Sequence, residues 1–251
     1  MAIFRGDVFS KTLPMEMGVT VIMPGDRLMG VNHEPAKVLY LLHGLTDNNS
    51  AWGRFTNIES YLHGKNVAVV MPDGNHGFYT DGKMSGAYFT YISKELPSLV
   101  EDMFRISARP EDTYIGGLSM GGYGALKCIL TYPERYAGCA AFSSLTDIKE
   151  YIHSGDVIAK RIGNALFGEG KEPTESDDLF KLAEKCAAEG KRLPEIYMSC
   201  GKGDVLYRQN VRFAEHLKEL NIKSEFDAWE GVHDWKFWNE SIQKAIKKFF
   251  G

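Results

Sequence analysis

The most informative stretch of the sequence is Thr113-Tyr-Ile-Gly-Gly-Leu-Ser-Met-Gly-Gly-Tyr-Gly124, in which one serine stands between glycines. A short β-like run precedes the serine and a helical run over 121–131 follows it, so Ser119 is expected on the tight turn between strand and helix. Gly117 and Gly121 stand two positions to either side, where missing side chains let strand and helix approach. The pattern predicts an exposed hydroxyl beside the free N–H groups of a helix N-terminus.

Two other interpretations of this stretch have to be weighed. In a chain with 26 glycines, a serine flanked by glycines can arise by chance. The run 116–124 also suggests a dinucleotide-binding loop, but Ser119 stands in its middle and no acidic residue ends a second strand at the required distance. The strand–turn–helix setting favours a nucleophilic serine over both alternatives.

A serine hydroxyl becomes a good nucleophile when a neighbouring imidazole accepts its proton. When the nucleophilic serine lies on such a strand–turn–helix, the catalytic residues follow the chain order serine, acid, histidine. Of seven histidines, His216 and His233 are the two that follow the later strands, and His216 falls in an amphipathic helix, where we expect it at the surface. His233 stands in a loop before the last helix, so we expect it to be the base, with a helix cap or a packing role as alternatives.

Asp204 is the candidate acid. It follows the strand-like run 196–200 on the glycine-rich turn Gly201-Lys-Gly-Asp204. Its carboxylate would accept the imidazole N–H, fix the tautomer and stabilise the imidazolium. The alternatives are a turn aspartate or the N-cap of the next helix.

Acyl transfer also needs donors for the oxygen that becomes negative. We expect one donor to be the backbone N–H of Met120, directly after the serine, and the other to be the N–H of Leu45 in the loop after an earlier strand. Gly44 would permit the turn that aims Leu45, and His43 is expected to orient this loop from below. These donors and the three side chains above predict acyl transfer through a covalent serine intermediate.

Strand-like and helix-like runs alternate along the chain, which predicts the α/β class: a mostly parallel sheet of about eight strands with helices on both faces. Strands are expected over 18–24, 38–42, 67–71, 113–116, 139–142, 196–200 and 224–229. Helices are expected over 88–104, 121–131, 179–188, 211–220 and 235–250. Asn221 is expected to end the fourth of these helices. The longest interval between strands, 146–193, is interpreted as a small cap-like insertion within a single domain over 1–251.

Charge and composition exclude several classes of function. The net charge of −4 gives no electrostatic case for a nucleic acid or an anionic membrane surface. The longest apolar runs, such as 38–42 and 67–71, are far shorter than the ~20 residues of a membrane-spanning helix. The N-terminus lacks the charged and apolar regions of a signal peptide. We therefore expect a soluble, cytoplasmic protein.

The four cysteines belong to no CxxC pair and to no spacing typical of a zinc site. They are Cys128, Cys139, Cys186 and Cys200. We expect free, buried thiols in a reducing compartment, with a Cys128–Cys139 bridge as the alternative. No metal is expected.

Six segments, in order along the chain, carry a family resemblance. They are Leu41-Leu-His-Gly-Leu-Thr46, Met71-Pro-Asp-Gly74, Gly77-Phe-Tyr-Thr80, Gly117-Leu-Ser-Met-Gly-Gly-Tyr-Gly124, Pro133-Glu-Arg-Tyr136 and Gly231-Val-His-Asp-Trp235. The chain resembles the esterase D branch of the α/β hydrolases, which includes tributyrin esterase-like carboxylesterases, S-formylglutathione hydrolases, and acetyl-xylan and feruloyl esterases. The stretch Thr56-Asn-Ile-Glu59 after Trp52 is most similar to the tributyrin esterase-like group.

The resemblance implies an α/β-hydrolase fold and a serine carboxylesterase without a cofactor. It would hydrolyse short-chain acyl esters, acetyl to butyryl, through an acyl-enzyme on Ser119. The implied partner is a small-molecule or carbohydrate ester, acetylated or feruloylated in the second case, and a homo-oligomer is left open. Four aromatic residues are expected to line the acyl pocket, each with a packing role as its alternative: Trp52, Phe78, Tyr79 and Trp235.

One departure from the family pattern bears on the substrate. Formylglutathione hydrolases typically carry Ser-Gly-Leu-Thr-Cys in the first oxyanion loop, whereas this loop reads His43-Gly-Leu-Thr-Asp47. The difference argues against a glutathione thioester as substrate. A thioesterase, an acyltransferase on the same scaffold and a catalytically silent binding protein are the remaining alternatives.

Overall fold

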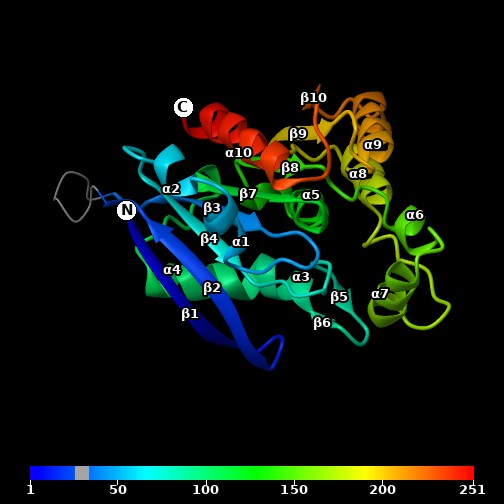
Figure 1. Cartoon of the computed structure of the whole chain (residues 1–251), viewed down its shortest axis with the longest axis horizontal. Helices are drawn as coiled ribbons and strands as arrows, with labels where there is room; N and C mark the ends of the chain where they lie inside the picture. Colours follow the sequence, from blue (N-terminus) through cyan, green and yellow to red (C-terminus); the bar gives the residue numbers. More distant parts are fainter. Residues whose placement is uncertain (26–33) are drawn as a thin grey trace.

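The central feature of the fold is one eight-stranded sheet, seen in a computed structural model that describes residues 1–25 and 34–251 (Figure 1). The spatial order is β1-β2-β4-β3-β7-β8-β9-β10. The strands are β1 (Ala2–Ser10), β2 (Met15–Met23), β3 (Lys37–Leu42), β4 (Val67–Pro72), β7 (Thr113–Leu118), β8 (Gly138–Phe142), β9 (Glu195–Gly201) and β10 (Ser224–Trp229). A separate two-stranded hairpin is formed by β5 (Asp81–Gly82) and β6 (Gly86–Ala87).

Six strands of the sheet run parallel, and β1 and β2 join them as an antiparallel edge. The predicted α/β class and the mostly parallel sheet of about eight strands are therefore confirmed. The expected strands do not include β1, because it lies at the sheet edge and most of its side chains are exposed. Without one buried face, the strand shows no clear alternation of apolar and polar residues.

Helices cover both faces of the sheet, which explains why the central strands are apolar throughout. The helices are α1 (Ala51–Phe55), α2 (Ile58–Tyr61), α3 (Tyr88–Thr90), α4 (Leu96–Met103), α5 (Met120–Thr131), α6 (Ile148–Ile152), α7 (Val157–Phe167), α8 (Leu179–Ala188), α9 (Tyr207–Glu219) and α10 (Trp235–Phe250). In β3, Tyr40 and Leu42 face the core beneath α4, α5, α8 and α9, whereas Leu39 and Leu41 face the core beneath α1, α2 and α10.

The helix expected over 88–104 is interrupted by a π-helical turn at Tyr91–Glu95. Pro97, in the first turn of α4, has no N–H to donate and leaves no room for a normal bond to the Ser93 carbonyl. The Leu96 N–H reaches back to the Tyr91 carbonyl, and the Ser93 carbonyl accepts from the Arg135 guanidinium instead. The side-chain periodicity alone does not reveal this break.

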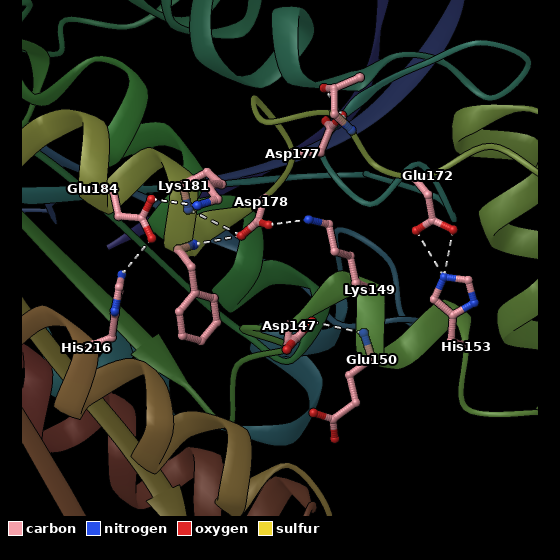
Figure 2. A network of polar contacts seen from close by, with 12 residues as sticks. Asp147, Lys149, Glu150, His153, Glu172, Asp177, Asp178, Lys181, Glu184 and His216 are labelled. Atoms are coloured by element: carbon pink, nitrogen blue, oxygen red, sulfur yellow. Dashed lines mark hydrogen bonds and ion pairs between the residues drawn. The ribbon is translucent and has the colours of Figure 1, made fainter.

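The other expected helices differ from the observed ones mainly at their ends. The helix expected over 211–220 begins earlier, at Tyr207, and α5 begins at Met120. Asn221 has φ +56° directly after the last turn of α9, as expected of a residue that ends a helix. His216 is only partly at the surface: its ring packs 5.0 Å from that of Phe180, and Nε2 lies 3.8 Å from Glu184 (Figure 2).

The segment 146–193 holds α6, α7 and α8, and side-chain pairs connect its parts. Figure 2 shows Lys149 on α6 paired with Asp178 at the start of α8, with 2.7 Å between Nζ and the carboxylate. It also shows His153, directly after α6, paired with Glu172 at 2.9 Å.

Several contacts attach this segment to the rest of the chain, and two of them show where it is held. The backbone N–H of Lys83, in the β5–β6 hairpin, donates to the Leu166 carbonyl of α7 at 2.8 Å. Lys127 on α5 forms an ion pair with Asp177 at 2.7 Å, with both side chains largely buried. The second contact reaches the helix that follows Ser119.

The remaining expectations concern cysteines, membranes and metals. All four cysteines are free and buried, Cys128 and Cys139 included. Within residues 1–25 and 34–251, no helix has both the length and the apolar character that crossing a membrane requires. The same residues contain no group of three or more His, Cys, Asp or Glu side chains arranged to hold a metal ion.

Candidate active site

Three neighbouring loops at the carboxyl edge of the sheet bring the expected catalytic side chains together. Ser119 follows β7, Asp204 follows β9, and His233 follows β10. Because the strands lie in the order β7-β8-β9-β10 and run parallel, their carboxyl ends open onto the same side of the sheet. The sequence separation of 114 residues between Ser119 and His233 is closed by this topology alone.

The three side chains form a continuous hydrogen-bonded chain. His233 Nε2 lies 3.1 Å from Ser119 Oγ, and His233 Nδ1 lies 2.9 Å and 3.1 Å from the two carboxylate oxygens of Asp204. With Nδ1 protonated, the ring donates to Asp204 and leaves the Nε2 lone pair to accept the hydroxyl proton of Ser119. This arrangement can generate a serine alkoxide-like nucleophile without a metal.

Asp204 has the environment of a permanently ionised carboxylate. Its side chain is fully buried, and one oxygen also accepts the Leu206 N–H at 2.8 Å. Burial by itself raises its pKa, but the hydrogen bond and charge of His233 and the Leu206 N–H hold the pKa below its ordinary value. Asp204 is thus also a turn aspartate, but it is not the N-cap of α9, a position that Leu206 occupies.

His233 is neither a helix cap nor a residue buried only for packing. The cap of α10 is the next residue, Asp234, whose carboxylate accepts the Phe237 N–H at 2.9 Å. The His233 side chain keeps 28% of its surface exposed, and its ring meets Trp238 edge to face at 4.9 Å. The tryptophan limits the ring's freedom while one edge stays open to the cavity.

The backbone at Ser119 is held in a sparsely populated conformation. Its φ of +52° and ψ of −115° lie outside the regions that residues with a Cβ prefer. The surrounding backbone fixes it: the Ser119 N–H donates to Phe142 of β8, and its carbonyl accepts from Leu145 and Tyr123. The turn points the hydroxyl out of the sheet, as the glycine pattern predicts.

The glycines beside this turn are required by close backbone approach. A Cβ on Gly117 would lie 2.5 Å from the Gly121 backbone, and one on Gly121 would lie 2.5 Å from the Leu42 carbonyl oxygen. No side-chain rearrangement relieves such contacts, because the colliding atoms are main-chain atoms.

The loop after β3 forms a turn in which the Asp47 N–H bonds the Gly44 carbonyl at 3.2 Å. The expected role of Gly44 needs correction here. The positive φ of the turn, +73°, belongs to Thr46. A Cβ at Gly44 would lie 2.4 Å from Leu118 Cδ1, so the Leu118 side chain would have to shift to make room for it.

Leu45 and Met120 both line the cavity beside Ser119, and the hydrogen bonding of their backbone N–H groups decides whether they can act as donors. Met120 is the first residue of α5, so its N–H has no partner within the helix. The N–H of Leu45 donates no hydrogen bond to any described residue, and both residues line the cavity. The positions match the two expected donors for an oxyanion.

His43 holds this loop from beneath. Its side chain is 1% exposed; Nδ1 lies 2.7 Å from the Gly44 carbonyl oxygen, and Nε2 accepts the Gly74 N–H at 2.8 Å. The imidazole thereby connects the loops after β3 and β4. Its placement agrees with an orienting residue and leaves no contact with Ser119 among its hydrogen bonds.

A cavity of about 550 Å³ opens above the serine. Phe78 and Trp235 line it, as expected. Trp52 and Tyr79 do not: they lie beneath the wall, where the Trp52 indole donates to the Leu42 carbonyl at 3.0 Å and the Tyr79 hydroxyl donates to the His43 carbonyl at 3.0 Å. The prediction that these two residues line the pocket is therefore corrected to a supporting role.

Sequence reasoning missed several residues of the cavity wall. These include Leu145, Tyr151, Val205, Leu206 and Trp238. Trp238 stands three positions after Trp235 in the first turns of α10, a spacing that puts both rings on one face of the helix. That spacing could have identified Trp238 as a second ring at the cavity. Tyr151 lies on α6, whose position over the cavity has no sequence signature.

Comparisons with known proteins agree with this geometry. A model of the Esterase family, described as "Putative esterase", matches residues 10–249. An acetyl esterase of Caldicellulosiruptor saccharolyticus is 35% identical, and the match covers 98% of this chain and 97% of that protein.

Two solved structures from Staphylococcus aureus are also similar. The fluorophosphonate-binding serine hydrolase F, with substrate bound, has a TM-score of 0.90 at 30% identity, covering 99% of this chain and 98% of that chain. An S-formylglutathione hydrolase without ligand has a TM-score of 0.87 at 31% identity over the same shares of the two chains.

Proposed function

Because the chain belongs to the esterase family and is a carboxylic ester hydrolase of the serine type, we propose that Ser119 is its nucleophile. His233 is the proposed base, and Asp204 is proposed to orient His233 and to stabilise its protonated form. The observation that carries the proposal is the unbroken chain of contacts from Ser119 Oγ through His233 to the buried Asp204 carboxylate.

The reaction proceeds in two steps. Ser119 Oγ attacks the ester carbonyl while His233 Nε2 takes its proton, and the resulting oxyanion lies against the N–H groups of Leu45 and Met120. The C–O bond to the alcohol then breaks, and the alcohol leaves with the proton from Nε2. A water molecule, deprotonated by the same nitrogen, then attacks the acyl carbon; the bond to Ser119 Oγ breaks, the carboxylic acid leaves, and Nε2 returns the proton to Ser119.

We propose short acyl chains, acetyl to butyryl, for the acyl group. The support is the 35% identical relative described as an acetyl esterase, together with a cavity of about 550 Å³ whose wall includes the Phe78 and Tyr151 rings, 5.5 Å apart. An acetylated or feruloylated carbohydrate is the proposed source of the ester. The 31% identity to an S-formylglutathione hydrolase keeps a thioester compatible, but no contact in the cavity favours it.

The segment 146–193 is proposed as a cap on a single domain. Tyr151 on α6 supports this, because it contributes to the cavity wall from outside the sheet and its loops. We propose a cytoplasmic location because all four cysteines are buried, free thiols, which suit a reducing compartment.

The test is a Ser119→Ala variant assayed with p-nitrophenyl acetate and labelled with a fluorophosphonate. We expect kcat to fall roughly 10⁴- to 10⁶-fold and the label to be lost, with the circular dichroism spectrum unchanged. Ser60→Ala, at an exposed position of α2, is the matched control and should keep both signals. Wild-type turnover or labelling in Ser119→Ala would refute the proposal.

The same assay resolves the substrate. A panel of acetyl to octanoyl esters, acetylated xylo-oligosaccharides, methyl ferulate and S-formylglutathione gives kcat/KM for each class. An added acceptor alcohol separates a hydrolase, which releases free acid, from an acyltransferase, which releases the new ester.

A further inference from the structure

The charged side chains that line the cavity, apart from His233, are carboxylates. They are Asp47, in the loop after β3, and Asp234, at the start of α10. Among the described residues of the lining there is no lysine or arginine. A bound ester therefore meets a negative field with no fixed cation in the wall to offset it.

The two carboxylates differ in how far their charge is already satisfied. Asp234 caps α10, accepting the Phe237 N–H at 2.9 Å, so its charge faces the positive end of a 16-residue helix. The Asp47 carboxylate accepts no hydrogen bond from any residue in the described part of the chain. Of the two cavity carboxylates, Asp47 therefore carries the charge that the protein compensates less.

The surroundings of Asp47 weaken the field of its carboxylate without cancelling it. Partial burial raises the pKa of Asp47, while His43 and Arg54 act in the opposite direction. Arg54 forms no ion pair with Asp47 within 4.0 Å; its guanidinium lies over the Phe55 ring at 5.0 Å, on the exposed surface of α1. The carboxylate is thus a partly desolvated group with no hydrogen-bond or ion-pair partner among the described residues.

We propose, resting on the proposed function, that Asp47 is a specificity-determining residue that selects esters by charge. It disfavours substrates that place an anionic group in the cavity and favours those that place a cationic group there. Asp47 lines the same cavity as Ser119 and stands two positions after Leu45, the proposed oxyanion donor, so a charged group near the scissile bond would share the cavity with its carboxylate. At the separations that a cavity of about 550 Å³ allows, the interaction of two unit charges corresponds to a roughly five- to tenfold change in kcat/KM.

The test compares two isosteric pairs of acetate esters. The first pair is 4-acetoxybenzoate, which is anionic, and 4-acetoxybenzamide, which is neutral. The second is acetylcholine, which is cationic, and 3,3-dimethylbutyl acetate, which is neutral. The readout is the ratio of kcat/KM within each pair, because any general effect of a substitution on turnover cancels in that ratio.

In Asp47→Asn, we expect the anionic-to-neutral ratio to rise about five- to tenfold and the cationic-to-neutral ratio to fall by a similar factor. Asp47→Glu should keep the wild-type ratios. Asp47→Ser provides a second neutral side chain, so that an altered turn cannot be mistaken for a lost charge. Asp102→Asn, on an exposed part of α4, changes the net charge equally and should leave both ratios unchanged.

Ratios within twofold of the wild type in both Asp47→Asn and Asp47→Ser would overturn the inference. The proposed function fails separately, through ester turnover that survives in Ser119→Ala. Higher salt should move both wild-type ratios toward those of Asp47→Asn, because ions screen a partly exposed charge.

Discussion

The buried pair of Lys127 and Asp177 offers a stability test whose outcome depends on pH. The Lys127 side chain is 4% exposed and the Asp177 side chain 11% exposed, and their charged atoms lie 2.7 Å apart. Thr80 bonds both groups, and Thr174 donates twice to the second Asp177 oxygen. Burial lowers the pKa of Lys127 although the charge of Asp177 opposes that shift.

Asp177→Asn removes the counter-charge and leaves Lys127 buried. A buried ion without its partner costs about 3–5 kcal/mol. The cost has a ceiling, because the ammonium can instead lose its proton: from an unfolded-state pKa of 10.4, neutral lysine costs about 5 kcal/mol at pH 7 and about 2 kcal/mol at pH 9. The unfolded chain then binds more protons than the folded one, so the stability of this variant rises with pH and its deficit against wild type shrinks.

Lys127→Met gives the opposite trend. Asp177 keeps its donors from Thr80 and Thr174, so we expect a smaller loss of about 3 kcal/mol at pH 7. Burial is the largest influence on the pKa of Asp177, so without the Lys127 charge we expect the pKa of this carboxyl to rise above its unfolded value and the folded chain to bind more protons. The deficit of this variant therefore shrinks as pH falls toward 5.

The assay is urea unfolding of wild type and both variants at pH 5, 7 and 9, with the free energy of unfolding compared at each pH. The double variant completes a cycle and gives the coupling between the two residues. Glu189→Gln, in an exposed pair with Lys191, should leave the midpoint unchanged. A loss below about 1 kcal/mol for Asp177→Asn at pH 7, or parallel pH trends in the two single variants, would refute the reasoning.

Two further outcomes follow from the site. Asp204→Asn should lower kcat roughly 10³- to 10⁴-fold with little change in KM, because His233 loses the acceptor that fixes its tautomer; a kcat within tenfold of wild type would exclude this role. Gly121→Ala should prevent normal folding or activity, because its Cβ meets the Leu42 carbonyl oxygen at 2.5 Å, whereas Gly53→Ala in α1, with no atom within 4 Å, should be tolerated. Soluble expression and p-nitrophenyl acetate turnover check the pair.

The central part of the fold was predictable because the parallel strands are buried on both faces. Strands such as β3 and β4 are short apolar runs with turn residues at their ends, and they were found nearly in full. The edge strand β1 lacks that signal. The break at Tyr91–Glu95 was missed because Pro97 acts on a carbonyl four residues earlier, an effect that hydrophobic periodicity does not record.

The candidate site likewise has a part that the sequence predicts and a part that it does not. The positions of Ser119, Asp204 and His233 could be inferred because each follows a recognisable strand and the order of the three is set by the topology. The residues of the cavity wall could not be inferred, because which aromatic ring reaches the cavity depends on how neighbouring rings pack against one another. Trp52 shows this: its indole packs edge to face on Trp235 at 5.1 Å and leaves that ring, not its own, at the cavity.

The connection between β8 and β9 is separate from the loops that carry the candidate catalytic side chains. The loops that carry Ser119, Asp204 and His233 follow β7, β9 and β10, so the long connection between β8 and β9 supplies none of these three side chains. Residues 146–193 can therefore be exchanged without changing those three side chains, provided that a replacement also buries the apolar face of α8, which belongs to the same core as α5. Lys127 sets a second condition on such exchanges: a replacement segment must carry its own carboxylate to the place of Asp177, or the lysine must be exchanged with it.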